Sequence, residues 1–188
     1  MPLSQAPSLL ALLLLPSFRR APASRVVNVS SIMHAVGEVN LIDPSFKERR
    51  YTPTAAYAQS KLAAIAFIAE LERRLETAGM SSIRCMSVHP GNVLTGVVRT
   101  LPHIVQTLYR IFMGRVLLTP EEGARSTVFC AASKEAAACA RPGPYFDSTC
   151  RLAFHHDDAD TPVLGKAVWE YIIHALELDE GALLKANC

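Results

Sequence analysis

The sequence predicts an α/β fold in which parallel strands alternate with crossover helices. A β-branched run, Arg25–Ser30, and a second predicted strand, Ile83–His89, are each followed by residues typical of turns. Between them lies a long apolar segment with helical periodicity, residues 54–78. The order strand, helix, strand is typical of a parallel sheet whose helices cover its faces.

Length and composition predict one globular unit. The chain has 188 residues, half of them apolar and 19% charged, which is enough to form a core. The net charge of +2 is too small to indicate a nucleic-acid partner. Five cysteines without a Cys-x-x-Cys pair predict free thiols in an intracellular protein rather than a secreted one. They indicate no zinc site, and we predict no metal.

The first predicted helix covers residues 9–20. Its apolar run, Leu9–Leu15, lies between Pro7 and Pro16 and is typical of a short buried helix. The same run also resembles the apolar part of a targeting segment, although no basic residue precedes it. It is too short to span a bilayer. Both alternatives remain open from the sequence.

The second predicted helix, residues 54–78, is apolar on more than one side and stops at Gly79. A helix that packs on the core with one face needs a narrower stripe of apolar residues than this one has. The helix is therefore either deeply buried or packed against a partner subunit.

The sequence of the C-terminal half predicts a loop, further helices and a short strand. Gly91, Gly96 and Pro102 mark a loop, and residues 103–118 form a hydrophobic segment typical of a surface helix. Thr119-Pro120-Glu121-Glu122 has the composition of a helix start, and that helix runs to about Ala132. A turn at residues 141–146 leads into a short strand, and a last helix covers residues 163–178 with Trp169 and Ile172 inward.

Tyr57 and Lys61 carry the clearest chemical signal. They lie four residues apart at the start of the long helix, and so on one face, one turn apart. An ammonium at that distance stabilises a phenolate, which suits a tyrosine to general acid–base chemistry on an alcohol or carbonyl.

Three motifs in order resemble the short-chain dehydrogenase/reductase family. A strand ending in Ser30-Ser31 is followed by Tyr57-Ala-Gln-Ser-Lys61, and then by a strand ending in Pro90-Gly-Asn-Val-Leu-Thr95. The insert before Tyr57, together with Glu70–Leu75 and Thr119–Gly123, is similar to the retinol dehydrogenase and WW-domain oxidoreductase group.

The resemblance implies a role for each matched residue. Tyr57 is the proton donor or acceptor, Lys61 assists it and binds the nicotinamide ribose, and Ser31 binds the substrate oxygen. Ser30 is structural by the same motif. Cofactor contacts are implied for Tyr57, Lys61, Pro90, Gly91, Val93 and Thr95. The resemblance implies NADP or NAD as the cofactor. The sequence does not distinguish between the two, because the segment that selects between them is missing.

Two features of that family are missing from the sequence. None of the nine glycines forms a glycine-rich turn between a strand and a helix, which is where a pyrophosphate binds. The family's asparagine is expected near Leu3 or Ser4, but the first asparagine is Asn28. The chain is therefore expected to be the C-terminal part of a doubly wound, Rossmann-type fold.

We accordingly predict one partial domain, residues 1–188, that lacks the first strands. It comprises a helix (9–20), the catalytic strand-helix-strand unit (25–95), and residues 96–188 with the C-terminal helices. The resemblance implies that the hydrophobic segment 103–118 is a lid over the substrate, as an alternative to a surface helix. The strand containing residues 26–29 would then lie at an exposed edge, which favours poor stability or oligomerisation.

The predicted function is hydride transfer between an alcohol and a carbonyl, with a lipophilic alcohol, aldehyde or ketone as substrate. The chain alone is expected to be weakly active or inactive. The alternative is a non-catalytic fragment that pairs with a full-length relative. A homo-oligomer or partner contact through helix 54–78 is expected, with a cytoplasmic location or a peripheral one on an intracellular membrane.

Overall fold

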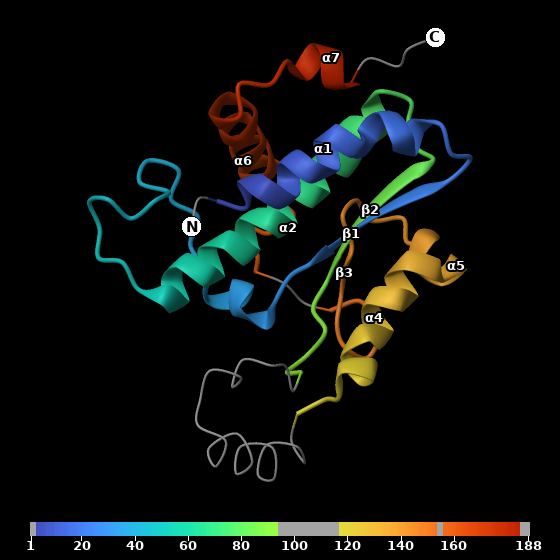
Figure 1. The fold of residues 1–188 in the computed structure, drawn as a ribbon, viewed down its shortest axis with the longest axis horizontal. Helices are drawn as coiled ribbons and strands as arrows, with labels where there is room; N and C mark the ends of the chain where they lie inside the picture. Colours follow the sequence, from blue (N-terminus) through green and yellow to red (C-terminus); the bar gives the residue numbers. More distant parts are fainter. Residues whose placement is uncertain (1–2, 94–116, 154–155, 185–188) are drawn as a thin grey trace.

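The computed structural model describes residues 3–93, 117–153 and 156–184 (Figure 1). The elements in chain order are α1 (Gln5–Arg19), β1 (Ser24–Val29), a 3-10 helix η1 (Ile32–Val36), α2 (Pro53–Thr77), β2 (Ile83–Val88), α4 (Pro120–Ala132), α5 (Lys134–Ala137), β3 (Tyr145–Phe146), α6 (Pro162–Ala175) and α7 (Glu180–Leu184).

The described strands form one parallel sheet in the order β1-β2-β3. Helices α1, α2 and α6 cover one face, and α4 and α5 cover the other (Figure 1). The predicted α/β class with a parallel sheet is confirmed.

Side chains alternate between the two faces of the sheet, as a strand requires. Val26 pairs in register with Cys85, and both belong to the core beneath α1, α2 and α6. Val27 pairs with Met86, and both belong to the smaller core on the α4 side. The sheet therefore has an apolar layer on each face, which is typical of parallel sheets.

Helix α2 begins at Pro53 because Thr52 caps it: the Thr52 hydroxyl accepts a hydrogen bond from the Ala55 backbone N–H at 3.1 Å. The predicted start at Thr54 is one residue late. Every residue from Leu62 to Glu72 is buried, so the wide apolar surface is covered by the chain's own elements. Among these, α6 contributes Trp169, whose ring stacks on Phe67 with centroids 5.4 Å apart.

Several predicted boundaries need correction. Helix α1 begins at Gln5 instead of Leu9 and buries one face only, with Leu12 and Leu15 inward. Helix α6 ends at Ala175 instead of Leu178, shortly before Glu177 takes a positive φ of 51°. By contrast, α4 ends at Ala132 as predicted, and Trp169 and Ile172 are buried as predicted.

The predicted exposed edge is present in the described part of the chain. Strand β1 pairs only with β2 there, and its residues are half-buried or exposed, whereas β2 is almost fully buried. The predicted lid, residues 103–118, lies almost wholly outside the described residues.

Candidate active site

The predicted site residues converge on one end of the sheet. Because β1 and β2 are parallel, Ser31 after β1 and Pro90-Gly91 after β2 lie at the same, C-terminal edge. In parallel sheets, ligands bind outside this edge. Helix α2 brings Tyr57 and Lys61 to the same edge, where Lys61 contacts the last residue of β1.

Tyr57 and Lys61 form an adjacent pair. The Lys61 Nζ atom lies 5.5 Å from the centroid of the Tyr57 ring. The tyrosine side is open, with 46% of Tyr57 exposed. Lys61 Nζ also donates a hydrogen bond of 3.0 Å to the backbone carbonyl of Val29. The Lys61 ammonium is therefore held at the end of β1, close to the Tyr57 ring.

The two serines after β1 differ in their environments. Ser30 is buried, and its hydroxyl donates a 3.3 Å hydrogen bond to the Lys61 backbone carbonyl, which ties β1 to α2. Ser31 is more accessible, and its Oγ accepts a 3.3 Å hydrogen bond from the Met33 N–H at the start of η1. Ser30 therefore joins β1 to α2, whereas Ser31 is the more accessible of the two serines at the C-terminal edge of the sheet.

Beneath Ser31 lies a layer of ring side chains that sequence reasoning did not find. His34 Nδ1 lies 2.7 Å from the Ser31 carbonyl oxygen, and the His34 ring meets Tyr145 edge-on at 4.8 Å. Tyr145 in turn stacks on His89, with centroids 5.8 Å apart. Burial lowers the pKa of His89, although the Asp147 carboxylate opposes this effect. These rings connect Ser31 with the turn after β2, from three separate parts of the sequence.

The turn after β2 has a required glycine. Gly91 adopts a φ of +80°, and a Cβ there would lie 2.8 Å from Leu118 Cδ1. Val93 pairs in a parallel bridge with Leu118 and packs against Gly123 of α4. The predicted cofactor contacts at Pro90, Gly91 and Val93 therefore lie together near α4. Thr95 lies outside the described residues.

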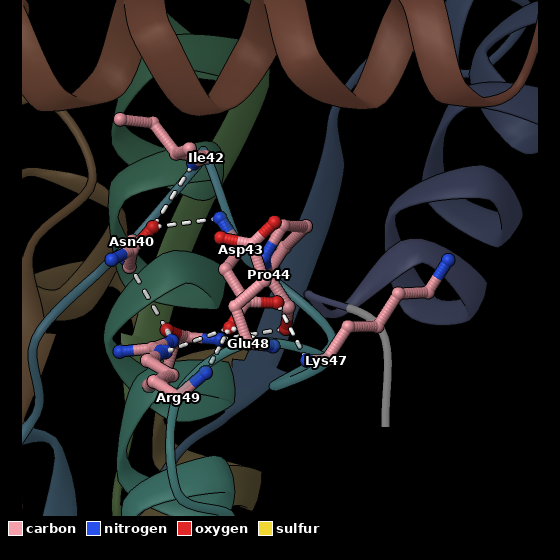
Figure 2. A network of polar contacts seen from close by, with 8 residues as sticks. Asn40, Ile42, Asp43, Pro44, Lys47, Glu48 and Arg49 are labelled. Atoms are coloured by element: carbon pink, nitrogen blue, oxygen red, sulfur yellow. Dashed lines mark hydrogen bonds and ion pairs between the residues drawn. The ribbon is translucent and has the colours of Figure 1, made fainter.

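The insert before Tyr57 is an ordered loop anchored on α2 (Figure 2). The Asp43 carboxylate accepts backbone hydrogen bonds from Lys47, Glu48 and Arg49 at 2.7–3.1 Å. The Arg49 N–H contributes most to holding the pKa of Asp43 below its usual value, against the raising effect of burial.

One glutamine connects this loop to the site helix. The buried Gln59 side chain accepts from the Asn40 N–H at 3.2 Å and donates to the Pro44 carbonyl at 3.0 Å. Gln59 lies between Tyr57 and Lys61 in sequence. The loop therefore fixes the part of α2 that carries the candidate catalytic pair.

The position expected for the family's asparagine also lies near this pair. Ser4 Oγ donates a 2.6 Å hydrogen bond to the backbone carbonyl of Ser60, next to Lys61. The expected position was Leu3 or Ser4, so a serine hydroxyl lies close to where the asparagine is expected.

The residues present fit the nicotinamide ribose of the cofactor better than its pyrophosphate. The accessible Tyr57 phenol and Lys61 ammonium, with Ser31, supply the donors and acceptors that suit a ribose and a reacting oxygen. Among the described residues, no group of glycines follows a strand and opens a helix, so these residues do not form a glycine-rich pyrophosphate site. Within the described residues, no three His, Cys, Asp or Glu side chains are placed to hold a metal ion.

Comparisons with known proteins identify the family to which this chain is similar. No family model matches it. Dehydrogenase/reductase SDR family member FEY of Arabidopsis thaliana is 34% identical over 194 residues, covering 96% of this chain and 50% of that protein. Retinol dehydrogenase 11 of Mus musculus is 32% identical, covering 86% of this chain and 48% of that protein. Polyprenol dehydrogenase of Mus musculus is 40% identical over 131 residues, or 68% of this chain and 38% of that protein.

A solved structure agrees with the fold. The crystal structure of an uncharacterised protein from Mycobacterium Paratuberculosis superposes with a TM-score of 0.59 at 28% identity. It covers 84% of this chain and 52% of that one.

The chain therefore belongs to the short-chain dehydrogenase/reductase family. Its relatives include retinol dehydrogenases, as the motifs predicted. The chain spans about half the length of the curated relatives it matches, in agreement with the prediction of a partial Rossmann-type fold.

Proposed function

We propose that the site serves reversible hydride transfer between an alcohol and a carbonyl, with NADP or NAD as the hydride carrier. The observation that carries this proposal is the Tyr57–Lys61 pair at the C-terminal end of two parallel strands, beside Ser31. Tyr57 donates a proton to the oxygen formed on reduction, or removes it on oxidation. Ser31 donates a hydrogen bond to that oxygen and stabilises its developing negative charge.

The substrate class we propose is a lipophilic alcohol, aldehyde or ketone. The names of two relatives, retinol dehydrogenase and polyprenol dehydrogenase, support a long apolar substrate. We place the protein in the cytoplasm or on the surface of an intracellular membrane, which its free cysteines support. Among the residues that the structure describes, no helix is long and apolar enough to cross a membrane.

We propose that this chain alone is weak or inactive, because the described residues form no pyrophosphate site. Titration of the purified chain with NADPH and NADH, followed by nucleotide fluorescence, tests the proposal. We expect weak, saturable binding that Lys61→Ala abolishes. Lys166→Ala is the matched control, since Lys166 is an exposed lysine of α6 away from the site. Equal binding by both variants would contradict a role for Lys61 with the nucleotide.

A second function is favoured by the open edge of β1. In this alternative the chain is a non-catalytic fragment that pairs with a full-length relative. Assembly with a second copy through helix 54–78 is a related proposal, although the middle of α2 is already buried within the chain. No nucleotide binding at millimolar concentration, together with co-purification of a longer relative, would favour the fragment over the enzyme.

A further inference from the structure

The two histidines of the ring layer use the same ring atom in opposite ways. His34 Nδ1 lies 2.7 Å from the Ser31 carbonyl oxygen, and because a carbonyl oxygen only accepts, His34 Nδ1 carries a hydrogen. His89 Nδ1 accepts a hydrogen bond of 3.1 Å from the Gly91 backbone N–H, so it carries none. The Gly91 hydrogen bond therefore requires a neutral His89 whose ring hydrogen is on Nε2.

Protonation has opposite consequences for these two contacts. A proton added to neutral His34 goes to Nε2 and leaves the Nδ1–H donor in place. A proton added to neutral His89 goes to Nδ1, which then has no lone pair for the Gly91 N–H. The charged ring also brings two N–H groups against each other across 3.1 Å. Acid therefore breaks the contact of His89 with Gly91 and leaves the contact of His34 with Ser31.

Strand β3 holds the His89 imidazole in this orientation. The His89 backbone N–H donates to the Phe146 carbonyl at 3.0 Å, which continues the pairing of β2 with β3. The imidazole stacks on the Tyr145 ring, with centroids 5.8 Å apart and an angle of 23° between the planes. Because β3 contacts both the backbone and the ring of His89, the direction of Nδ1 towards Gly91 is set by the sheet.

The turn that His89 contacts lies in a crowded place. A Cβ on Gly91 would lie 2.8 Å from Leu118 Cδ1 and 3.0 Å from Ser148 Cβ. Two residues further on, Val93 packs against Gly123 of α4. A Gly91 N–H that loses its acceptor must find another one, and between these neighbours it does so only by a shift of the turn.

We propose that His89 is a positioning residue: its neutral imidazole holds the Pro90-Gly91 turn in the shape that meets the nicotinamide cofactor, and protonation of Nδ1 releases the turn. The cofactor part of this inference rests on the proposed function. The hydrogen bond between Gly91 and His89 does not, so the two parts are tested separately.

The surroundings of His89 set the pH range of the release. Burial lowers the pKa of His89 below its ordinary 6.5, and the Asp147 carboxylate acts in the opposite direction. We therefore expect the turn to be held at neutral pH and released below about pH 6.5. Further titratable side chains on the elements around the turn are His34 of η1, Tyr57 and Lys61 of α2, Glu121 and Glu122 of α4, and Tyr145 of β3.

Nuclear magnetic resonance of the intact chain tests the hydrogen bond without a ligand. Imidazole nitrogen chemical shifts, followed from about pH 8 to 5, report which ring nitrogen carries a hydrogen. We expect His89 to change from the Nε2–H form to the doubly protonated form in step with the Gly91 amide resonance. An Nδ1–H form of neutral His89, a ring that stays neutral to pH 5, or a Gly91 amide that does not follow it would overturn the proposal.

Two variants of similar size separate the acceptor from the ring. His89→Asn places an oxygen near the position of Nδ1 that accepts but does not titrate, whereas His89→Leu removes the acceptor. Both remove the stacking on Tyr145. By calorimetric titration with NAD⁺ and NADP⁺ at about pH 7.5, we expect His89→Leu to bind about fivefold more weakly than His89→Asn, as for one lost hydrogen bond. Equal affinities of the two variants would overturn the role of the acceptor.

The pH dependence of nucleotide affinity distinguishes the two proposals. Relative to His89→Asn at each pH, which cancels titration of the nucleotide itself, wild-type affinity should fall by about fivefold between about pH 7.5 and 5. His174→Asn, in the exposed last turn of α6, is the matched control and should behave as the wild type. A constant ratio would overturn the release. If no variant binds either nucleotide while the Gly91 amide follows His89, the proposed function fails and the positioning contact stands.

Discussion

Strands β1 and β2 differ in how the backbone N–H and C=O groups that point away from their shared pairing are hydrogen-bonded. Beyond β2, the Ser87 N–H donates to the Pro144 carbonyl just before β3 at 2.9 Å, and the His89 N–H donates to the Phe146 carbonyl of β3 at 3.0 Å. Strand β3 is too short to reach further, and there the Cys85 N–H donates to the Glu72 carboxylate at 3.2 Å. Beyond β1, the Lys61 ammonium donates a hydrogen bond of 3.0 Å to the Val29 carbonyl.

Both of these side chains come from α2. Lys61 and Glu72 lie eleven residues apart in the sequence, about three turns of a helix, and so on the same face. Helix α2 therefore supplies the Glu72 carboxylate as the acceptor for the Cys85 N–H of β2. It supplies the Lys61 ammonium as the donor to the Val29 carbonyl of β1. Among the described residues, β2 therefore has hydrogen-bond partners on both sides, whereas β1 has a strand partner on one side only.

The largest expected effect lies on the completed side, at Gly143. Its N–H donates to Glu72, it adopts a φ of +59°, and a Cβ there would lie 2.4 Å from the Ala69 Cα. We expect Gly143→Ala to lower the free energy of unfolding by about 3 kcal/mol or more, since backbone overlap adds to strain. Urea unfolding followed by circular dichroism measures this loss.

Gly79 is the control for that substitution. It has a similar φ of +76°, but no atom lies within 4 Å of a Cβ built there. Gly79→Ala therefore isolates the conformational strain, and we expect a loss of about 1 kcal/mol. Equal losses at the two positions would mean that the close approach of Gly143 to α2 has no energetic consequence.

The next effect compares two valines that are direct partners in the sheet, Val88 of β2 and Val29 of β1. Val88 is fully buried and Val29 is 44% exposed. Val88→Ala should cost about 2 kcal/mol, from lost burial and the cavity that remains. Val29→Ala should cost about 0.5 kcal/mol, as for other exposed positions.

These losses are read from urea midpoints at unchanged denaturant dependence. Equal losses at the two positions would show that burial does not determine the cost of truncating these paired valines.

How much of this could be predicted from the sequence depends on the range of the interactions. The helix start at Thr119-Pro120 was predicted from local capping chemistry, and Thr119 forms a complete capping box with Glu122. The cap at Thr52-Pro53 has the same chemistry but was missed by the predicted start at Thr54. The alternation of strands and helices along the chain and the inward positions Trp169 and Ile172 follow from hydrophobic periodicity.

The ring layer of His34, His89 and Tyr145 could not be predicted, because it joins three distant segments. Glu72 did carry a signal: an acidic residue within a buried apolar helix, three turns from Lys61. The motif residues Ser31, Tyr57 and Lys61 were located by spacing, whereas their chemical roles stay predictions.

The smallest expected effect concerns pH, and it contrasts Glu72 with Asp43. Burial raises the pKa of Glu72 above 4.5, against the lowering effects of the Gly143 N–H and Arg84. A raised carboxyl pKa means that folding takes up a proton. The stability due to this group is therefore present below pH 4.5 and is lost as pH rises through the folded-state pKa.

Asp43 has the opposite sign, because its pKa lies below 3.8 in the folded chain. Its contribution is present above pH 3.8 and is lost as pH falls through the folded-state pKa. Melting temperatures of the wild type, Glu72→Gln and Asp43→Asn from about pH 2.5 to 7 separate the two. We expect Glu72→Gln to flatten the decline above pH 4.5 and Asp43→Asn to flatten the decline in acid. Parallel profiles for all three proteins would show that neither carboxyl group titrates differently in the folded chain, and that Glu72 completes the β2 edge without an electrostatic cost.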